Sequence, residues 1–417
     1  MIETPTNLMV PTYPRSVQPG IPRLSPPPEG WSTRRFGDLL KVVQRPVRMT
    51  DEGEYDLVTV RRSRGGIETR GRFRGKDISV KSQFALESGD FLISKRQIVH
   101  GACAVVPEEF AGSIVSNEYA VLRCKPGLDL GFLRYLSHSV YFQQTCFHSS
   151  IGVHVEKMIF KLEDWLKFRV NVPPLDEQKR IAAGFEAIDA KLTALREKAD
   201  GLRQFKTGLM QRLFSQDLRF TRDDGSDFPD WEERKLGDIA TFFKGKGVSK
   251  ADIEDGGATP CIRYGEIYTR YSERITEIAS ATNVDPSDLF LSEIGDVIIP
   301  ASGEDRLDMA RACCVTMPGV ALGGDINVLR SPIRGDFLAY YLNNARKKDV
   351  AMLGQGNSVV HLYPVHLRTL HIEIPHPDEQ SNIADALSAL DAKIDAVTDQ
   401  ITHMETFKKG ILQKMFV

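Results

Sequence analysis

The sequence predicts an α+β fold, in which two strand-rich domains form a tandem pseudo-repeat and are separated by two long helices. Three observations lead to this prediction. The stretch from Asp176 to Phe214 recurs from Asp378 to Phe416, both copies carry a seven-residue apolar pattern, and short β-branched and aromatic runs broken by glycine precede each copy. Self-similarity at a fixed offset indicates a repeat architecture.

The two copies have the pattern of coiled-coil helices. Each begins with Asp-Glu-Gln, at residues 176–178 and 378–380, and each follows prolines, as a helix start should. Apolar residues recur in alternating steps of four and three, which describes a coiled-coil seam. At ~1.5 Å per residue each helix would be roughly 58 Å long. The seam residues that we predict are Ile181, Phe185, Ile188, Leu192, Leu195 and Leu202 in the first copy and Ile383, Leu387, Leu390, Ile394, Val397 and Ile401 in the second.

A lysine interrupts one apolar row at the same place in both copies, Lys206 in the first and Lys408 in the second. Two interpretations remain open. Either these are solvated lysines near helix ends, or they set the register of the helices or meet a partner.

The order of landmarks divides the chain into five parts. Residues 1–30 carry eight prolines and are expected to form a flexible arm, with a strap across a neighbouring surface as the alternative. A first domain at 31–172 and a spacer helix at 173–216 follow. A linker with the second domain at 217–374 and a C-terminal spacer helix at 375–417 complete the chain.

The same short motifs open and cross both domains. A tryptophan followed by Gly-Asp occurs at residues 31–38 and again at 231–238, and a Gly-Asp before an apolar run occurs at 89–93 and 295–299. Phe-Leu-x-Tyr recurs at 132–135 and 337–340, on what reads as a short helix. Between these landmarks the halves barely resemble each other. A constant frame with different inserts suggests one task performed on two targets.

Composition limits the class of protein. With 417 residues, 41% of them apolar, the chain has material for two or three cores, and its net charge of −2 argues neither for nor against nucleic acid. Its 6 cysteines show no CxxC pair, which fits reduced thiols in the cytoplasm. The sequence shows no signal peptide and no apolar run of 18 residues, so we expect a cytoplasmic protein without a membrane partner.

Basic residues on glycine-rich stretches mark a candidate DNA contact in the first domain. Arginine can neutralise phosphates and can pair with guanine through two hydrogen bonds. A charge run is more often only a solvated face, so both readings stay open. The candidates are Arg61, Arg62, Arg64, Arg70, Arg72, Arg74, Lys81, Lys95 and Arg96.

The second domain offers a different and less basic set of candidates. The stretch from Ile262 to Arg311 is net acidic, although a carboxylate can still accept a hydrogen bond from cytosine N4. The candidate DNA contacts are Lys244, Lys246, Lys250, Arg263, Tyr264, Arg306, Arg311, Asn357, Ser358 and His361.

The sequence contains no complete catalytic motif, and each partial match is better explained by structure. Phe243 to Gly247 matches the F-x-G-x-G pattern of adenosylmethionine-dependent methyltransferases, but no Asn/Asp-Pro-Pro-aromatic tetrapeptide accompanies it. A glycine-rich basic loop is the better interpretation. The sequence contains no G-x-x-x-x-G-K-S/T phosphate loop and no paired metal-ligand spacing. We therefore expect no catalysis, no metal and no cofactor in this chain.

The duplicated order of motifs resembles the specificity subunit of type I restriction–modification enzymes. The resemblance rests on two divergent domains, each opened by Trp and Gly-Asp and closed by Pro-Pro-Leu-Asp-Glu-Gln at 173–178 or Pro-His-Pro-Asp-Glu-Gln at 375–380. It runs from Trp31 to Phe416, and includes the linker around residues 218–231.

The resemblance implies a non-catalytic DNA-reading subunit of a bacterial or archaeal phage-defence system. Each domain would read one half of a split double-stranded DNA site, and the two helices would pack antiparallel as a spacer that sets the distance between half-sites, about one helical turn (~10 bp) apart. Two adenine-N6 methyltransferase subunits that bind adenosylmethionine would dock on the spacer. Two restriction subunits that use ATP and Mg²⁺ would join them.

Two other classes of function remain. The chain could be a coiled-coil scaffold whose domains bind proteins, in which case strong salt-dependent DNA binding would be missing. It could also be a self-sufficient DNA enzyme, which the missing motifs argue against and which an activity assay on the lone chain would test.

Overall fold

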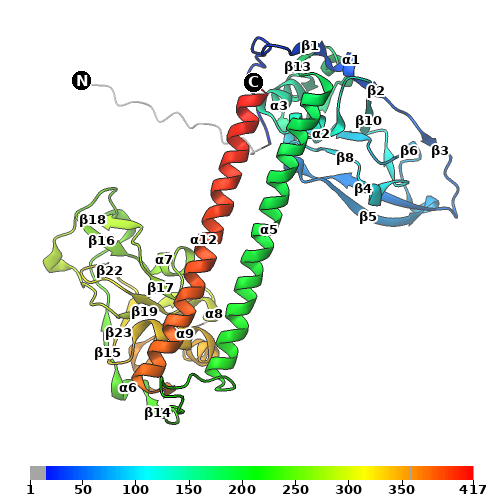
Figure 1. Ribbon diagram of the computed structural model, residues 1–417. Helices are drawn as coiled ribbons and strands as arrows, with labels where there is room; N and C mark the ends of the chain where they lie inside the picture. Colours follow the sequence, from blue (N-terminus) through cyan, green and yellow to red (C-terminus); the bar gives the residue numbers. More distant parts are fainter. Residues whose placement is uncertain (1–15, 357, 417) are drawn as a thin grey trace, which may run out of the picture. The chain divides into compact units, whose positions relative to one another are not determined.

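The computed structural model describes residues 16–356 and 358–416 (Figure 1). The chain divides into two units, one formed by Met1–Ala194 with Gln400–Val417 and the other by Leu195–Asp399. Helix α5 spans Leu175–Phe214 and helix α12 spans Pro377–Met415, so each unit contains one strand-rich domain and parts of both helices. The first half of the arm expected at residues 1–30 lies outside the described residues.

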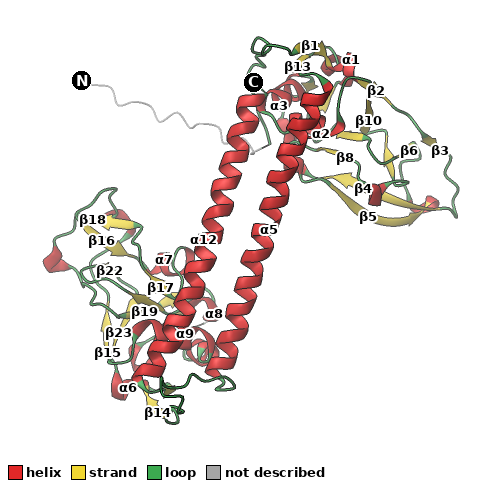
Figure 2. Ribbon diagram, viewed as in Figure 1, coloured by secondary structure: helices red, strands yellow, loops and turns green. Residues whose placement is uncertain are grey.

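The first domain is built on two sheets (Figure 2), with strand orders β2-β10-β7-β8 and β3-β6-β9-β4-β5. A separate antiparallel pair, β1 with β13, brings the start and the end of the domain together at Ser32 and Val172. The strands are β1 Ser32–Arg35, β2 Leu40–Val42, β3 Pro46–Val47, β4 Glu54–Val60, β5 Ile67–Arg74, β6 Gln83–Ala85, β7 Phe91–Ser94, β8 Cys103–Val105, β9 Ile114–Ser116, β10 Tyr119–Cys124, β11 Ser150–Ile151, β12 Ile159–Phe160 and β13 Arg169–Val172.

Short helices cover the four-stranded sheet and close an aromatic core. Trp165 is fully buried and stacks on Phe36 with ring centroids 4.3 Å apart. Its indole N–H donates to Thr145, so the one polar atom of this large side chain is satisfied. The helices are α1 Phe36–Leu39, α2 Leu130–Leu136, α3 Val140–His148 and α4 Leu162–Trp165, with the 3₁₀ turns η1 Arg62–Arg64, η2 Gly75–Asp77, η3 Ile98–His100, η4 Glu108–Phe110 and η5 Val155–Lys157.

The second domain repeats the frame around different inserted strands. A five-stranded sheet has the order β15-β23-β19-β21-β17, a three-stranded sheet has the order β18-β16-β22, and β14 pairs with β25 as β1 does with β13. The strands are β14 Glu232–Lys235, β15 Thr241–Lys244, β16 Thr259–Ile262, β17 Arg274–Ile275, β18 Ser280–Thr282, β19 Val297–Pro300, β20 Ser302–Gly303, β21 Cys313–Val315, β22 Ala321–Leu322, β23 Ile326–Arg330, β24 Val360–His361 and β25 His371–Ile374.

The longest domain helix, α9, lies in the core of the second unit. Its side chains are buried from Phe337 to Leu342, and Phe337 and Tyr341 receive the ring of Phe214 at 6.1 and 5.5 Å. The helices are α6 Leu236–Ile239, α7 Tyr264–Thr269, α8 Arg306–Met309, α9 Gly335–Asn344, α10 Lys347–Met352 and α11 Pro364–Leu367, with the 3₁₀ turns η6 Lys250–Asp252 and η7 Pro286–Asp288.

The Asp-Glu-Gln motifs fasten each domain to the start of its own long helix. In the first unit the indole N–H of Trp31 donates to Glu177 at 3.1 Å, and the backbone N–H of Asp129 donates to the Gln178 side chain at 2.8 Å. In the second unit Trp231 donates to Glu379 at 3.2 Å, and the Gln380 side chain accepts from the backbone N–H of Arg334, the residue directly before α9. The duplicated motif is therefore a structural joint.

The Gly-Asp motifs hold buried carboxylates. The side chains of Asp90 and Asp296 are both fully buried, and each accepts a hydrogen bond at 2.8 Å from an arginine Nε, Arg123 in the first domain and Arg330 in the second. Removing one partner of such a buried pair leaves a charge without compensation, which is costly. The motif thus fixes strand β7 or β19 to strand β10 or β23.

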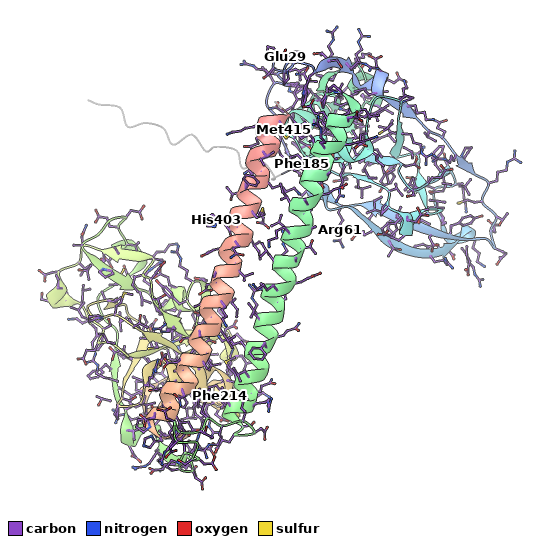
Figure 3. The ribbon with its side chains drawn as sticks, in the orientation of Figure 1. Glu29, Arg61, Phe185, Phe214, His403 and Met415 are labelled. Carbon is purple, nitrogen blue, oxygen red and sulfur yellow. The ribbon has the colours of Figure 1, made fainter. Side chains whose placement is uncertain are left out.

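The two long helices pack antiparallel, and the expected fold class is confirmed. Within the first unit the final part of α12 lies beside the first part of α5, where Phe185 and Met415 belong to one apolar cluster (Figure 3). Within the second unit Leu195 and Ala199 of α5 and Val397 of α12 are buried. Of the predicted seam residues, eight are buried and Ile181, Ile188, Leu202 and Ile401 are half-buried.

The two seam lysines form ion pairs, which corresponds to the register-setting interpretation. Lys206 Nζ lies 2.7 Å from Asp391 and 3.1 Å from Glu273, and 11% of its side chain is exposed. Lys408 contacts Asp189 in the same way, on the opposite helix of the first unit. In each unit the aspartate also accepts a hydrogen bond from a buried tyrosine, Tyr340 to Asp391 and Tyr135 to Asp189. The same lysine–aspartate–tyrosine group therefore occurs at equivalent points of the two units.

The described part of the N-terminal arm runs along the first domain. Val17 is buried, the carbonyl of Gly20 lies 2.8 Å from His148 Nε2, and the carbonyl of Ser25 accepts from Asn171 at 2.8 Å. These contacts are those of a strap. Its proline-rich stretch closes a small cavity of about 230 Å³ beside Phe416.

Candidate nucleic-acid interface

The arginine-rich stretch of the first domain is an antiparallel hairpin of β4 and β5, and β5 is the edge strand of its sheet. The pairing passes from Val58–Thr69 to Leu57–Gly71, so Arg70 is an extra residue in a β-bulge. Bulges re-aim a side chain. Arg70 is exposed, and it forms no ion pair with any other residue that the structure describes.

Most of the other arginines of this stretch already have acidic partners. Arg72 donates to Asp56 directly across the hairpin at 2.7 and 2.8 Å, and this hydrogen bond lowers the pKa of the Asp56 carboxyl. A phosphate would have to displace such a carboxylate, which weakens the net gain. The remaining pairs are Arg61 with Glu68, Arg62 with Glu156, Arg74 with Glu52 and Arg96 with Glu118.

Arg64 points into the domain. Its backbone has a φ of 59°, in the left-handed region, and its N–H donates to Gly101. The guanidinium donates to the carbonyl of Ser137 at 2.8 Å and to the side chain of Gln143 at 2.9 Å, and burial lowers its pKa. The structure therefore places Arg64 in a packing role.

Two lysines of the first domain hold loops by donating to backbone carbonyls. Lys81 Nζ donates to Gly75 at 2.7 Å, and Lys95 Nζ donates to Asn117 at 2.8 Å in the turn between β9 and β10. Each ammonium retains further donors that could meet an anion.

In the second domain the Phe-Lys-Gly-Lys-Gly loop runs against another backbone. Gly245 donates to Ile326, and a Cβ at position 245 would lie 2.0 Å from the carbonyl of Gly323. Gly247 has a φ of 86°, where a side chain would be strained. Close backbone approach explains both glycines without a bound cofactor, and the exposed Lys244 and Lys246 lie on this loop.

The structure brings four of the second-domain candidates together. The Tyr268 hydroxyl donates to the carbonyl of Ser302 at 2.5 Å, and the ring of Tyr264 lies 6.4 Å from that of Tyr268. Strand β20 pairs Ser302 with His361. Arg306 donates to the carbonyl of Gly356 at 3.2 Å, next to the loop that contains the exposed Ser358. We name this group, Tyr264, Arg306, Ser358 and His361, the tyrosine–histidine surface.

The remaining candidates lie apart from the tyrosine–histidine surface or have internal roles. Lys250 is exposed at the start of η6. Arg263 lies 3.5 Å from the buried Glu266, and Arg311 donates to the carbonyl of Tyr271, so both guanidinium groups stabilise the domain. Asn357 lies outside the described residues.

Sequence reasoning missed Tyr363, which belongs to the tyrosine–histidine surface. It is 42% exposed and its ring stacks on that of His361, with centroids 6.0 Å apart. No sequence motif marks this residue. The correspondence of the two halves in this region rests on backbone hydrogen bonds, since Leu362 and Leu370 make the same contacts as Phe160 and Phe168.

Three further properties of the described residues bear on the class of protein. Among residues 16–356 and 358–416 no group of three or more His, Cys, Asp or Glu side chains could hold a metal ion. None of the helices in that part of the chain is long and apolar enough to cross a bilayer. Burial raises the pKa of the Cys103 thiol to about 11, which makes it unreactive near neutral pH.

Comparison with known proteins gives a consistent picture. The family described as Type I restriction modification DNA specificity domain matches residues 28–201 and 229–405. The type I restriction enzyme MjaVIII specificity subunit of Methanocaldococcus jannaschii is 24% identical over 416 residues, and the putative MjaX specificity subunit of the same organism is 24% identical over 417 residues. Each comparison covers 92% of this chain and 92% of the relative.

Two solved structures share the fold. The HsdS subunit from Thermoanaerobacter tengcongensis has 18% identity and a TM-score of 0.53, covering 93% of this chain and 96% of its own. The S subunit of a type I restriction–modification system from M. genitalium has 16% identity and a TM-score of 0.57, covering 95% and 99%. At these identities the likeness concerns the fold.

Proposed function

Because the chain belongs to the type I restriction–modification specificity family and is the non-catalytic DNA specificity subunit of such a complex, we propose that its two domains read the two halves of a bipartite site in double-stranded DNA. We take residues 31–172 and 217–374, the latter with its linker, as the recognition domains. One observation supports the proposal. Both domains have the same tryptophan–glutamate bond to a long helix and the same buried aspartate–arginine pair, although the strands inserted between these contacts differ.

We propose that the antiparallel helices α5 and α12, within the spacer segments 173–216 and 375–417, set the separation of the half-sites and dock two adenine-N6 methyltransferase subunits. Those partners would bind adenosylmethionine, and two restriction subunits would supply ATP and Mg²⁺ chemistry in the cytoplasm. On both helices the side that faces away from the apolar seam is polar and exposed, which leaves surface for partners.

The basic candidates of the first domain are proposed as its DNA contacts, with different weights. Arg70 is exposed and forms no ion pair with another described residue, so we propose it as the strongest phosphate contact. Arg61, Arg62, Arg72, Arg74 and Arg96 would exchange an acidic partner for a phosphate, Lys81 and Lys95 would use spare donors, and Arg64 would act through packing.

In the second domain we propose the tyrosine–histidine surface with Lys244 and Lys246 as the reading face. Tyrosine, histidine and serine offer hydrogen bonds and apolar contact to base edges, whereas the lysines offer charge to phosphates. Lys250 and Asn357 complete the proposed contacts, and Arg263 and Arg311 would act through the packing of the domain.

The test is methylome sequencing of cells that express the chain with its methyltransferase, compared with cells that lack the chain. A split adenine-methylated motif that disappears on deletion supports the proposal. In parallel, binding of the purified chain to DNA should weaken steeply as salt rises. An unchanged methylome together with salt-insensitive or absent DNA binding would favour a protein scaffold instead.

A further inference from the structure

The frames of the two domains correspond residue by residue around one surface. The Phe160 N–H donates to Lys95 at 2.9 Å, as Leu362 does to Ala301 at 2.9 Å. The Lys95 N–H donates to Glu118, as Ala301 does to Asp325. These matching hydrogen bonds make Phe160 equivalent to Leu362 and Lys95 equivalent to Ala301.

The correspondence extends to the first strand of each frame. Strand β2 pairs Lys41 with Arg123, and strand β15 pairs Thr241 with Arg330. Since Arg123 and Arg330 make equivalent bonds to the buried aspartates, Lys41 corresponds to Thr241. Three residues further along the chain, just past the end of β2, Gln44 corresponds to Lys244 at the end of β15. By the Phe160–Leu362 match, Lys161 corresponds to Tyr363.

In the first domain Gln44 and Lys161 line a groove of about 640 Å³. It lies between strands β2 and β10 on one side and the segment Ile159–Leu166 on the other. The groove is thus the counterpart of the surface that carries Lys244, His361 and Tyr363 in the second domain.

Three polar side chains that line the groove are available to a ligand. Gln44, Asn117 and Lys161 are exposed, and within the described part of the chain none of their side chains makes a hydrogen bond or ion pair. Val42 and Ile159, 47% and 44% exposed, add apolar surface to the walls. A polar groove with free amides and exposed methyl groups can match a mixed donor, acceptor and apolar surface.

The charges of the groove favour base edges over a phosphate strand. Lys95 and Lys161 lie near Glu163 and Asp164 on the same lining, so the groove lacks the one-sided positive charge that phosphates prefer. Amide groups can pair with adenine through two hydrogen bonds, carboxylates accept from cytosine N4, and apolar side chains contact the thymine methyl.

We propose that this groove reads base edges of one DNA half-site, with Gln44 and Asn117 as the specificity-determining residues and the arginine hairpin as a backbone contact. The inference rests on the proposed function, because it takes equivalent faces of the two domains to meet the two half-sites.

The experiment uses the full chain assembled with its methyltransferase and a library of DNA duplexes with randomised sites, and sequences the methylated products. The variants are Gln44→Ala, Asn117→Ala and the isosteric Gln44→Glu. Lys41→Ala, at an exposed residue of strand β2 three positions before Gln44 that does not line the groove, is the control.

We expect Gln44→Ala or Asn117→Ala to lower the preference at one or two base pairs of a single half-site by roughly tenfold, which is within the worth of a bidentate base contact. The other half-site and the gap should stay unchanged. Gln44→Glu should shift the preference towards cytosine at that position, and Lys41→Ala should behave as the wild type.

Two outcomes overturn the inference while leaving the proposed function intact: unchanged preferences in all three groove variants, or an equal loss on every sequence, which indicates phosphate contact. A wild-type complex that yields no bipartite motif overturns the proposed function itself. Thermal unfolding of each variant separates lost reading from lost folding, and the isosteric Gln44→Glu carries the test if an alanine variant unfolds.

Discussion

At the scale of single residues, pairing decides which arginines are available to DNA. Arg62 and Glu156 lie 94 positions apart and yet form an ion pair at 2.7 Å. The sequence shows that arginines are numerous but not that acidic residues from distant segments meet them. For this reason the pattern predicts a basic stretch, whereas only the structure separates Arg64, Arg70 and Arg72 by environment.

Replacing Arg64 by alanine should destabilise the first domain by about 2 kcal/mol, because the carbonyl of Ser137 would lose its donor inside the protein. Urea unfolding of the full chain measures this loss. Arg61→Ala, which removes an exposed arginine of the same stretch, should change stability by less than about 0.5 kcal/mol. Equal effects of the two variants would contradict a packing role.

Replacing Arg70 by alanine should leave stability almost unchanged and weaken DNA binding on all sequences alike. One lost phosphate contact lowers the slope of log K against log salt by about 1. Fluorescence anisotropy with a duplex at several salt concentrations measures the slope. Lys198→Ala, an exposed lysine of α5, serves as the control, and an identical slope in both variants would exclude Arg70 as a contact.

At the scale of elements, the long helices were the most predictable part of the molecule. The repeat predicted copies at 176–214 and 378–416, and α5 and α12 span Leu175–Phe214 and Pro377–Met415. The seven-residue apolar pattern and the helix-start residues involve neighbours along the chain, so the sequence alone can predict these helices. Strand orders such as β3-β6-β9-β4-β5 depend on pairings between distant segments, and short irregular strands carry little periodicity to predict them.

The seam lysines should be coupled to their aspartates in stability. Lys408→Met alone removes the ammonium from the half-buried Asp189 and leaves it the hydroxyl of Tyr135 as its hydrogen-bond donor among the described residues, at a cost of about 2 kcal/mol. The double variant Lys408→Met with Asp189→Asn should cost less than the sum of the single variants by about 1 kcal/mol. Thermal unfolding of all four proteins gives the coupling, and strict additivity would mean that the pair does not cooperate.

The buried tyrosines should make stability depend on alkaline pH. Burial, together with the hydrogen bond to Asp391, raises the pKa of Tyr340 above its ordinary value of 10.0. The contribution of this phenol is therefore complete below about pH 10 and is lost as the pH rises further, because the unfolded chain ionises first. Tyr340→Phe should cost about 1 kcal/mol at pH 7, and the difference from wild type should shrink above pH 10 in unfolding experiments.

At the scale of the whole molecule, two copies of one frame carry unlike inserts. The contacts of Trp31 and Trp231 with their helices, and of Asp90 and Asp296 with their arginines, are the same in both units. This frame was predictable because its motifs occur twice in the sequence, in the same order. Which insert residues face DNA was not, since each insert occurs once and its loops are positioned by long-range contacts.

Lengthening both spacer helices should lengthen the recognised gap. Four extra residues after Ala194 and four after Asp399 add one turn, ~6 Å, to each helix, which corresponds to roughly two base pairs of ~3.4 Å. Methylation mapping reads the gap directly. As a control, four residues inserted at Asp224, in the turn of the linker outside both helices, should leave the gap unchanged. The same gap in both variants would contradict the proposal that the spacer helices set the separation of the half-sites.

The hydrogen bonds between Trp31 and Glu177 and between Trp231 and Glu379 place an optical reporter at each joint. The chain has 3 tryptophans, and the third, Trp165, lies in the core of the first domain. With Trp31 and Trp165 changed to phenylalanine, the remaining indole emission would come from the second joint alone. In the purified chain, the wavelength and quenching of this emission would then report in real time whether the second domain stays attached to its helix when DNA binds.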